Sequence, residues 1–360
     1  MQIPLILVGD HVKAPDGPAP QTRPRLDYEE ITRLLAGELC CTQSSFVRLY
    51  TLGQRIDQYL RLDLMAAMLA ARRIARYSAI LSLSEKSAIP LAALSYARRL
   101  PVPHIVVAHK LSSGQKVHLF RSWPLHRRFN HLISVCSSQA EYAIANLGLP
   151  RRRVNFFYDK VDQLFFQPQA DSSEEYILAV GLEQRDYGTL LQALQGTHLQ
   201  TIILANSRWN AHSVQLQAPP HVKILTSRLS YTDVRSLYAG ARLVVVPLYP
   251  VDYAAGVNSV LETMAMAKPL VVSQVVGIRD YIVDGETGWF AKPGSPQHLR
   301  EQIMRLWSDD AARRRVGANA RQAVLQQMNL DLYAANVANV VTQAVAQSGH
   351  GFSPANDAPI

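Results

Sequence analysis

The residues best suited to chemistry in this chain of 360 residues surround the start of one helix. The helix is expected to begin at Gly256, Val257 and Asn258, where the first backbone N–H groups have no partner inside the helix. Such a helix end attracts anions, and phosphate above all. Glu262 is the only carboxylate of the helix, and it can accept hydrogen bonds from a sugar diol such as a ribose. The pattern predicts a site for a nucleotide-like ligand.

A cation for the same ligand is expected in the loop Leu182–Gly188, which follows a predicted strand. Arg185 is the only cation of that loop, and a guanidinium can pair with a diphosphate. The loop Tyr249–Gly256, which precedes the helix, adds Asp252 and Tyr253. In parallel sheets such loops gather at the carboxyl ends of the strands, where ligands bind.

Two further candidates lie beside other predicted strands. His109 directly follows the strand Val102–Ala108, so it is placed to touch a substrate, although a histidine there can equally bind a loop carbonyl. Arg228 follows the strand Val222–Leu225 and is a candidate for ligand binding.

Alternating strands and helices must position these residues. Leu243–Leu248 is a continuous apolar run, typical of a parallel strand buried on both faces. Strand and helix patterns alternate nearly throughout, which predicts an α/β fold with doubly wound sheets. The other predicted strands are 1–9, 80–84, 102–108, 131–136, 151–157, 176–181, 201–205 and 222–225. The main predicted helices are 26–39, 55–77, 86–99, 137–147, 189–194, 231–239 and 308–346.

The length of the chain exceeds the usual size of a single core, so two domains are expected. The segment Asp159–Ser173 is polar and contains Pro168, which indicates a linker. We predict one domain over residues 1–165 and a second over 166–346, whose last helix packs back on the first domain. A disordered tail is expected over 347–360. The carboxyl ends of both sheets would face each other across a cleft.

The net charge of +9 is concentrated in the first part of the chain. Up to Ala170 there are 22 Lys and Arg against 12 Asp and Glu, a balance of +10, and the remainder has 15 against 16, or −1. A basic domain favours an anionic partner such as a lipid surface or an acidic acceptor, and a solvated basic surface is the alternative.

Basic and aromatic residues are mixed in the segment Gly114–Asn130. This mixture is typical of an interfacial segment at an anionic membrane, and also of a core-facing helix with a basic outer face. It could also stack on single-stranded nucleic acid, but the sequence contains no recognised nucleic-acid module, so no nucleic-acid partner is expected.

Cysteine usage and hydropathy address the cellular location. The three cysteines, Cys40, Cys41 and Cys136, cannot form a disulfide framework and lack metal-ligand spacing, which favours a reducing cytoplasm. The apolar start at residues 1–9 is too short for a signal peptide, and no segment reaches the ~18 apolar residues of a spanning helix. The sequence predicts a cytoplasmic protein, peripheral at the inner membrane face if its basic half binds lipid.

Several motifs of the second half resemble a known family. The segments Gly256–Ser273, Gly277–Asp280 and Asp284–Gly294 resemble the nucleotide-sugar site of family 4 retaining glycosyltransferases. The resemblance extends from Tyr176 to near Leu325, and the first half matches mainly in the order of its strands. It implies the GT-B architecture of two Rossmann-like domains that face across a cleft. The second domain would bind the donor and the first the acceptor.

The resemblance also assigns roles to single residues. Glu262 matches the second glutamate of the family's Glu-x7-Glu motif, which holds the ribose hydroxyls. The first glutamate, which contacts the transferred sugar, is replaced by Ala254, and Asp252 or Tyr253 could compensate. The donor-binding residues that we predict are Gly256, Val257, Asn258, Glu262, Tyr253 and Arg228.

The family's usual cations are replaced as well. Leu182 and Tyr187 occupy the positions of an arginine and a lysine, so the role of neutralising the leaving diphosphate falls to Arg185. His109 would position the sugar. The catalytic residues that we predict are His109, Arg185 and Asp252.

The function that the resemblance implies is that of a metal-independent, hexosyltransferase-like enzyme without cofactor. It would move a sugar from a nucleoside diphosphate sugar to an acceptor hydroxyl with retained anomeric configuration. A lipid or polysaccharide precursor is the expected acceptor, and the leaving phosphate would take its proton. The alternative is a non-catalytic glycosyltransferase-like protein that binds nucleotide sugar or a partner, and Ala254 favours it. An oxidoreductase would need a Gly-x-Gly-x-x-Gly after a first strand, which is missing.

Overall fold

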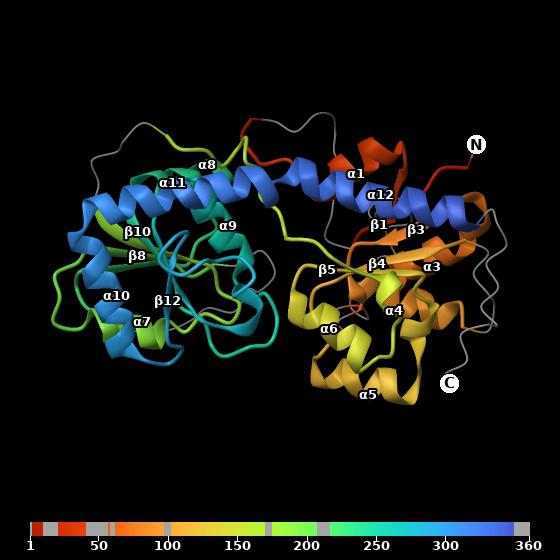
Figure 1. Cartoon of the computed structure of the whole chain (residues 1–360), viewed down its shortest axis with the longest axis horizontal. Coiled ribbons are helices and arrows are strands. Elements are labelled where there is room, and N and C mark those ends of the chain that lie inside the picture. The colour runs from red at the N-terminus through yellow and green to blue at the C-terminus, as the bar shows by residue number, and fades with distance from the viewer. Residues whose placement is uncertain are drawn as a thin grey trace. The chain divides into compact units, whose positions relative to one another are not determined.

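The computed structural model describes residues 2–9, 21–40, 57, 62–96, 102–169, 175–206 and 217–348 (Figure 1). The chain forms two compact units, and each is built on a six-stranded sheet in which all paired strands are parallel. Unit 1 consists of residues 1–18, 26–157 and 333–360, and unit 2 of residues 19–25 and 158–332. The predicted α/β class with two doubly wound sheets is confirmed.

The sheet of unit 1 has the order β2-β1-β3-β4-β5-β6. Its strands are β1 (Leu5–Leu7), β2 (Glu38–Cys40), β3 (Ile80–Ser82), β4 (His104–Ala108), β5 (His131–Ser134) and β6 (Val154–Phe156). Its helices are α1 (Asp27–Leu35), α3 (Leu64–Arg73), α4 (Glu85–Leu94), α5 (Gly114–Ser122), α6 (Ser137–Ala145) and most of α12 (Leu330–Ser348), with short 3₁₀ turns η2 (Ile74–Arg76), η3 (Leu125–Arg128) and η4 (Arg151–Arg153).

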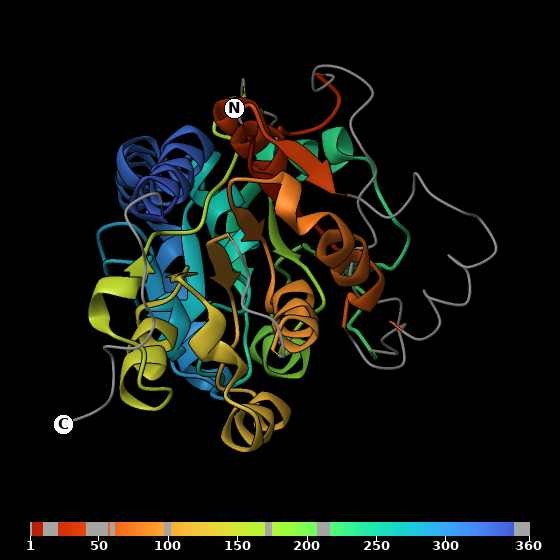
Figure 2. The ribbon, with the colours of Figure 1, turned by 90° about the vertical axis from the view of Figure 1, so that its right-hand side faces the viewer.

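Both faces of this sheet are covered, as Figure 2 shows for unit 1. Because side chains alternate along a strand, Ile105 and Val107 of β4 pack with residues of α1 and α12. Val106 and Ala108 of the same strand pack with residues of α4, α5 and α6 on the opposite face. Burial on both faces explains why the parallel strands read as continuous apolar runs.

The sheet of unit 2 has the order β12-β11-β10-β7-β8-β9. Its strands are β7 (Tyr176–Val180), β8 (Thr201–Leu204), β9 (Val222–Leu225), β10 (Ala241–Val246), β11 (Leu270–Ser273) and β12 (Trp289–Ala291). Its helices are α7 (Tyr187–Leu194), α8 (Tyr231–Gly240), α9 (Val257–Ala265), α10 (Pro296–Ser308) and α11 (Asp310–Gln327), with the 3₁₀ turn η5 (Val276–Ile278). Leu243 and Val245 of β10 join a core with α7 and α10, and the neighbouring Val244 and Val246 are also fully buried.

Strand β2 lies within a segment for which the sequence predicted only helix. The predicted helix 26–39 ends instead at Leu35, and Ala36 adopts a left-handed φ of 45°. A Cβ on the next residue, Gly37, would lie 2.5 Å from the Ile6 side chain, so the chain turns here in contact with β1. The prediction was wrong because this close approach is a tertiary contact that periodicity does not report.

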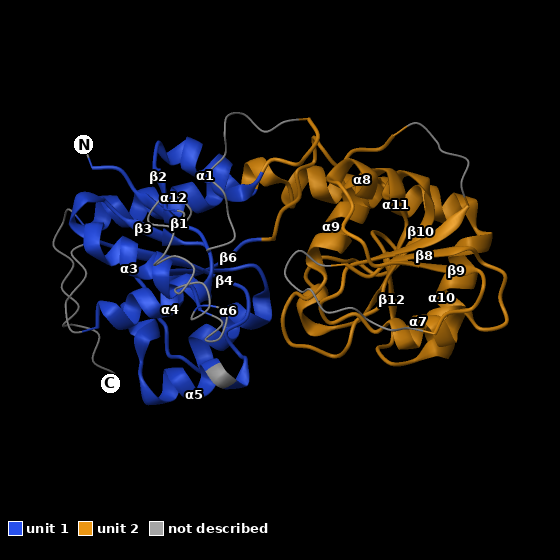
Figure 3. Cartoon of the chain, turned by 180° about the vertical axis from the view of Figure 1, so that it is seen from behind, with its two compact units in different colours: residues 1–18, 26–157, 333–360 blue, residues 19–25, 158–332 orange. Residues whose placement is uncertain are grey.

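The chain passes between the units after Arg25, Phe157 and Leu332 in its described parts (Figure 3). The sequence placed the boundary eight residues later, at 165/166. Residues 158–166 belong to unit 2 because Phe165 stacks edge-on against Tyr231 of α8 and lies 4.4 Å beneath the Arg235 guanidinium.

The predicted last helix, 308–346, is divided into α11 and α12, with Asp309 as the N-cap of α11. Residues from Tyr333 onward belong to unit 1, where Tyr333, Val337 and Val341 are buried against its sheet. Most of the predicted disordered tail, from residue 349 on, lies outside the described residues.

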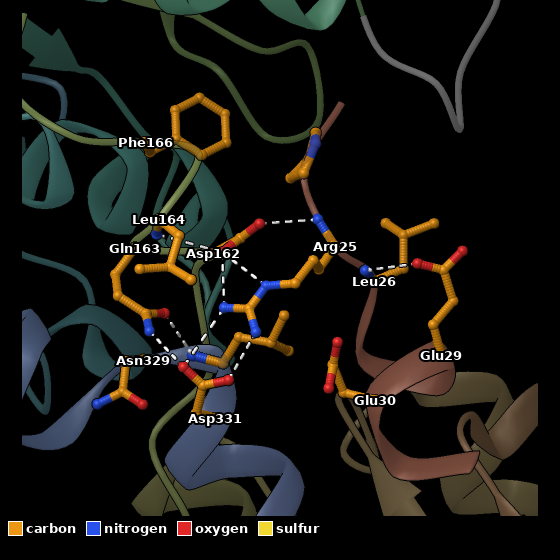
Figure 4. A network of polar contacts seen from close by, with 12 residues as sticks. Arg25, Leu26, Glu29, Glu30, Asp162, Gln163, Leu164, Phe166, Asn329 and Asp331 are labelled. Atoms are coloured by element: carbon orange, nitrogen blue, oxygen red, sulfur yellow. Dashed lines mark hydrogen bonds and ion pairs between the residues drawn. The ribbon is translucent and has the colours of Figure 1, made fainter. Parts of the chain in front are cut away.

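Arg25 links the segments of unit 2 that lie next to these three passages (Figure 4). Its guanidinium binds the buried carboxylate of Asp162 at 2.9 Å and the half-exposed carboxylate of Asp331 at 2.7 Å. The Arg25 backbone N–H also donates to Asp162 Oδ2 at 2.8 Å. One side chain therefore ties together three segments that are far apart in sequence.

Candidate functional site

The predicted cation of unit 2, Arg185, is almost wholly buried. Its Nε donates to the Val180 carbonyl and its Nη1 to the Glu183 carbonyl, each at 3.0 Å. Nη2 donates to Ser259 Oγ at 2.9 Å, within the first turn of α9. Within the described ranges, no carboxylate forms an ion pair with it. Burial lowers the pKa of the guanidinium, and neighbouring tyrosines and glutamates oppose that shift.

Two glycines allow the guanidinium to reach this position. A Cβ on Gly181 would lie 2.5 Å from Arg185 Nη2, and a Cβ on Gly256 would lie 2.9 Å from Nη1. Both glycines have positive φ, +110° and +81°. Gly256 is the N-cap of α9 and provides no capping side chain. The charge of Arg185 and the positive end of the helix dipole therefore lie together, and both favour an anion.

The loops after β7 and β10 form one surface, although about 65 residues separate them in sequence. The two strands are neighbours in the sheet, and a bridge joins Arg185 to Leu248 beyond their ends. The Asp186 N–H donates to the Pro247 carbonyl at 3.1 Å, and the Tyr249 N–H donates to the Gln184 carbonyl at 3.0 Å. These contacts bring Arg185 and the start of α9 together, as the sequence predicted.

Glu262 lies one turn inside α9 and is partly exposed. The hydroxyl of Tyr238, a fully buried residue of α8, donates to Glu262 Oε2 at 2.8 Å. Burial and the nearby carboxylate hold the pKa of Tyr238 well above its ordinary value, so its proton is retained as a donor. A carboxylate oriented in this way can accept hydrogen bonds from a diol.

The loop before α9 carries Asp252, Tyr253 and Ala254. Tyr253 is buried, and its hydroxyl donates to Glu183 Oε1 at 3.0 Å. Ala254, where the resemblance expects a glutamate, is also buried, whereas Asp252 is exposed. A Cβ on Gly277 would lie 2.2 Å from the Tyr253 carbonyl carbon, so this loop is pressed against η5.

The other predicted donor-binding residues lie at different distances from Arg185 along the sheet. Asn258 is exposed on the first turn of α9, and Val257 beside it is buried. Arg228 is exposed after β9, the edge strand, two positions away from β7 in the sheet. In the described part of the chain, no hydrogen bond or ion pair joins Arg228 to Arg185 or Glu262.

The predicted site residue of unit 1, His109, follows β4 and lies beside the carboxylate of Glu85. The distance from His109 Nδ1 to Glu85 Oε2 is 3.7 Å. Glu85 is buried at the start of α4 and also accepts from the Lys110 N–H at 2.6 Å and Lys116 Nζ at 2.9 Å. Burial opposes ionisation, but the neighbouring His109 imidazole and the charge of Lys116 hold the pKa of Glu85 well below its ordinary range.

Sequence reasoning missed Glu85, Glu183, Tyr238 and Ser259. For Glu85 a signal was available, because Ser84 caps a helix that begins with an acidic residue just after a predicted strand. Tyr238 carried no such signal, since its contact with Glu262 joins two helices 24 positions apart.

The basic segment 114–130 has most of its aromatic side chains in the core. Phe120 and Phe129 are buried with Leu125, whereas Trp123, Arg121 and Arg127 are exposed. This arrangement matches the predicted alternative of a core-facing segment with a basic outer face. No helix in the described ranges is long and apolar enough to cross a membrane. Those ranges also contain no group of three or more His, Cys, Asp and Glu side chains arranged to hold a metal.

Comparison with known proteins relates unit 2 to glycosyltransferases. Residues 206–323, which include α9 and Glu262, match the family described as glycosyl transferases group 1. An uncharacterized glycosyltransferase of Methanocaldococcus jannaschii is 29% identical over 103 residues, which are 28% of this chain and 28% of that protein. The capsular polysaccharide biosynthesis glycosyltransferase CapM of Staphylococcus aureus is 29% identical over 93 residues, 26% of this chain and 24% of CapM. The aligned segment thus spans about a quarter of each relative.

The fold is shared over nearly the whole chain. The crystal structure of Anabaena HepE in complex with UDP-glucose has a TM-score of 0.71 at 15% sequence identity, covering 95% of this chain and 100% of that one. The match to this structure confirms the predicted fold class, and the family match relates the segment around α9 to group 1 glycosyltransferases.

Proposed function

We propose that the chain is a retaining, metal-independent glycosyltransferase that moves a sugar from a nucleoside diphosphate sugar to an acceptor hydroxyl. One observation carries this proposal: Arg185 is a buried cation that forms no ion pair within the described residues, and it lies against the N-terminus of α9. A buried charge is costly unless something compensates it, and a bound diphosphate would supply that compensation. The helix belongs to the segment that matches group 1 glycosyltransferases.

In the proposed reaction the bond between the anomeric carbon and the diphosphate oxygen breaks, and a bond from the same carbon to the acceptor oxygen forms. Negative charge grows on the departing diphosphate. The N–H groups at the start of α9 and the positive field of Arg185 would stabilise that charge more in the transition state than in the ground state. The acceptor proton passes to the leaving phosphate, so neither a metal nor a side-chain base is required.

Glu262, oriented by Tyr238, would hold the ribose hydroxyls of the donor. In unit 1, the role that the resemblance gives to His109 is supported by its place at the end of β4 and by its contact with Glu85. A carboxylate beside one ring nitrogen helps to fix the orientation of an imidazole ring.

For the acceptor we propose a lipid-linked or polysaccharide precursor at an anionic membrane surface. The +10 balance up to Ala170 supports it, and CapM, one of the relatives, is named for capsular polysaccharide biosynthesis. Binding to anionic vesicles is expected at low salt and should weaken as salt rises. If the protein does not co-sediment with such vesicles at low salt, the proposed binding to a membrane surface is wrong.

The enzyme itself is tested by a thermal-shift screen of nucleoside diphosphate sugars that begins with UDP-glucose. A donor at 100 times its Kd should add about 2.7 kcal/mol of stability. The protein is then incubated with the donor that stabilises it and with candidate acceptors. Sugar transfer is measured as the release of nucleoside diphosphate. If no nucleoside diphosphate sugar stabilises the protein, the proposal is wrong.

A second candidate function is binding of nucleotide sugar without transfer. Ala254 favours it, because a methyl group cannot accept a hydrogen bond from the transferred sugar. Tight binding of a donor, with neither transfer nor hydrolysis for any acceptor in the panel, would support this alternative.

A further inference from the structure

The side chain of Glu183 is exposed and yet held in place. It lies in the loop after β7, and its Oε1 accepts a hydrogen bond of 3.0 Å from the buried Tyr253 hydroxyl. Its backbone is fixed as well, since its carbonyl accepts from Arg185 Nη1 at 3.0 Å. The next residue, Gln184, has a left-handed φ of 54°, a conformation that non-glycine residues adopt rarely.

No cation accounts for this constraint. In the described part of the chain no Lys, Arg or His forms an ion pair with Glu183, and of its two carboxylate oxygens only Oε1 accepts a hydrogen bond there. Fixing an exposed glutamate costs side-chain entropy, up to about 2 kcal/mol. Strained backbone beside a fixed polar group is characteristic of ligand sites. Among the described residues no group binds the second oxygen, so it can accept a hydrogen bond from outside the protein.

The chemistry of a carboxylate limits what that ligand group can be. An ionised carboxylate only accepts hydrogen bonds, so its partner must donate, and it repels a phosphate. The loop that carries Glu183 also carries Arg185, whose guanidinium lies against the N-cap of α9. A diphosphate bound there would bring the hydroxyls of its attached sugar into the same loop region.

We propose that Glu183, positioned by Tyr253, is the carboxylate that recognises the transferred sugar by accepting hydrogen bonds from its hydroxyl groups. This inference rests on the proposed function and adds the residue that recognises the transferred sugar. Tyr253 immediately precedes Ala254, the position at which the resemblance expects a carboxylate. The loop after β7 would thus supply, through Glu183, the carboxylate that is missing at Ala254 in the loop after β10.

The test compares the affinity for a nucleoside diphosphate with the affinity for the same nucleotide carrying a sugar. UDP and UDP-glucose form the first pair and GDP and GDP-mannose the second, measured by calorimetry on the full chain. Glu183→Ala should weaken binding of the sugar nucleotide about tenfold, or 1.4 kcal/mol, and change binding of the bare nucleotide less than about twofold. Tyr253→Phe should also weaken binding of the sugar nucleotide more than binding of the bare nucleotide, but by a smaller factor than Glu183→Ala.

Controls separate a structural role from recognition. Glu183→Gln retains an oxygen that can accept from Tyr253, so its thermal midpoint should equal that of the wild type while the selective loss persists. Glu301→Gln, an exposed carboxylate of α10, should change neither affinity. Equal changes for both ligands of a pair, or none, overturn the role of Glu183. A wild-type protein that binds neither pair would instead contradict the proposed function.

Discussion

Arg25 and Arg185 are two arginines of unit 2 whose guanidinium groups differ in their partners and in the direction of their pKa shifts. Arg25 binds two carboxylates, and although partial burial acts to lower its pKa, the hydrogen bonds that it donates to Asp331 and Asp162 raise it. Arg185 is buried more deeply, its hydrogen bonds in the described part of the chain go to two carbonyls and a hydroxyl, and burial lowers its pKa. The charge of Arg25 is neutralised inside the unit, whereas that of Arg185 can be compensated by a bound anion.

This difference indicates what to look for in a buried cation. A buried ion pair with complete partners holds segments together, and removing one partner is costly. A buried guanidinium without a carboxylate, placed at a helix N-terminus, is poised for a ligand. Substitution of each arginine tests whether ligand binding depends on Arg185 and stability on Arg25.

The largest effect is expected for Arg185→Met. Loss of a charge-assisted interaction worth about 2 kcal/mol should weaken nucleoside diphosphate binding about thirtyfold, as measured by calorimetry with UDP and GDP. Arg300→Met is the matched control, because Arg300 also donates to backbone carbonyls, those of Ala193 and Gln195, but in a different part of unit 2. Equal loss in both variants would show that Arg185 acts only through folding.

For Arg25→Met the expected effect is on stability and not on binding. The buried Asp162 carboxylate would lose its cation, which should lower the free energy of unfolding by about 2 kcal/mol. Differential scanning calorimetry measures the shift. Arg151→Met, which breaks an exposed pair with Glu141, should cost less than about 0.5 kcal/mol. A loss of nucleotide affinity comparable to that of Arg185→Met would abolish the distinction between the two arginines.

A smaller effect on the ligand side is expected at Glu262. Glu262→Ala should weaken binding of a nucleoside diphosphate and of its sugar derivative alike, about tenfold, because both contain the ribose. Tyr238→Phe should weaken both about threefold, since it removes only the hydrogen bond that orients the carboxylate. If Glu262→Ala changed the affinity neither for ribonucleotides nor for 2′-deoxynucleotides, the ribose assignment would be contradicted.

The smallest effect is expected in the pH dependence of unit 1. Glu85 resembles Arg25 in having its charge compensated internally, by Lys116 and His109, and its pKa in the folded protein is depressed. Its contribution to stability should therefore be complete above the ordinary glutamate pKa of about 4.5 and should decline as pH falls toward the folded value. Glu85→Gln should flatten this acid limb in thermal melts between pH 6 and pH 3, whereas Glu141→Gln should leave it unchanged.

Sequence patterns predicted some of these features well and others poorly, for identifiable reasons. The run Leu243–Leu248 and the helix at Val257 were recognised because burial on both faces and an open helix start leave local signatures. Strand β2 was missed because a left-handed Ala36 and the contact of Gly37 with Ile6 interrupt a helical pattern. The boundary near residue 165 shifted because Phe165 packs on α8.

The sequence by itself determined the α/β class and the start of a helix at Gly256, because both follow from local pattern and backbone chemistry. It also singled out Arg185 and Glu262. Only the tertiary structure decided how these residues are supported: Arg185 against two glycines, Glu262 under Tyr238, and Glu183 held by Tyr253. These contacts join loops and helices that are separated by up to 71 positions, from Arg185 to Gly256, and no local pattern encodes which side chains of adjacent strand ends will meet.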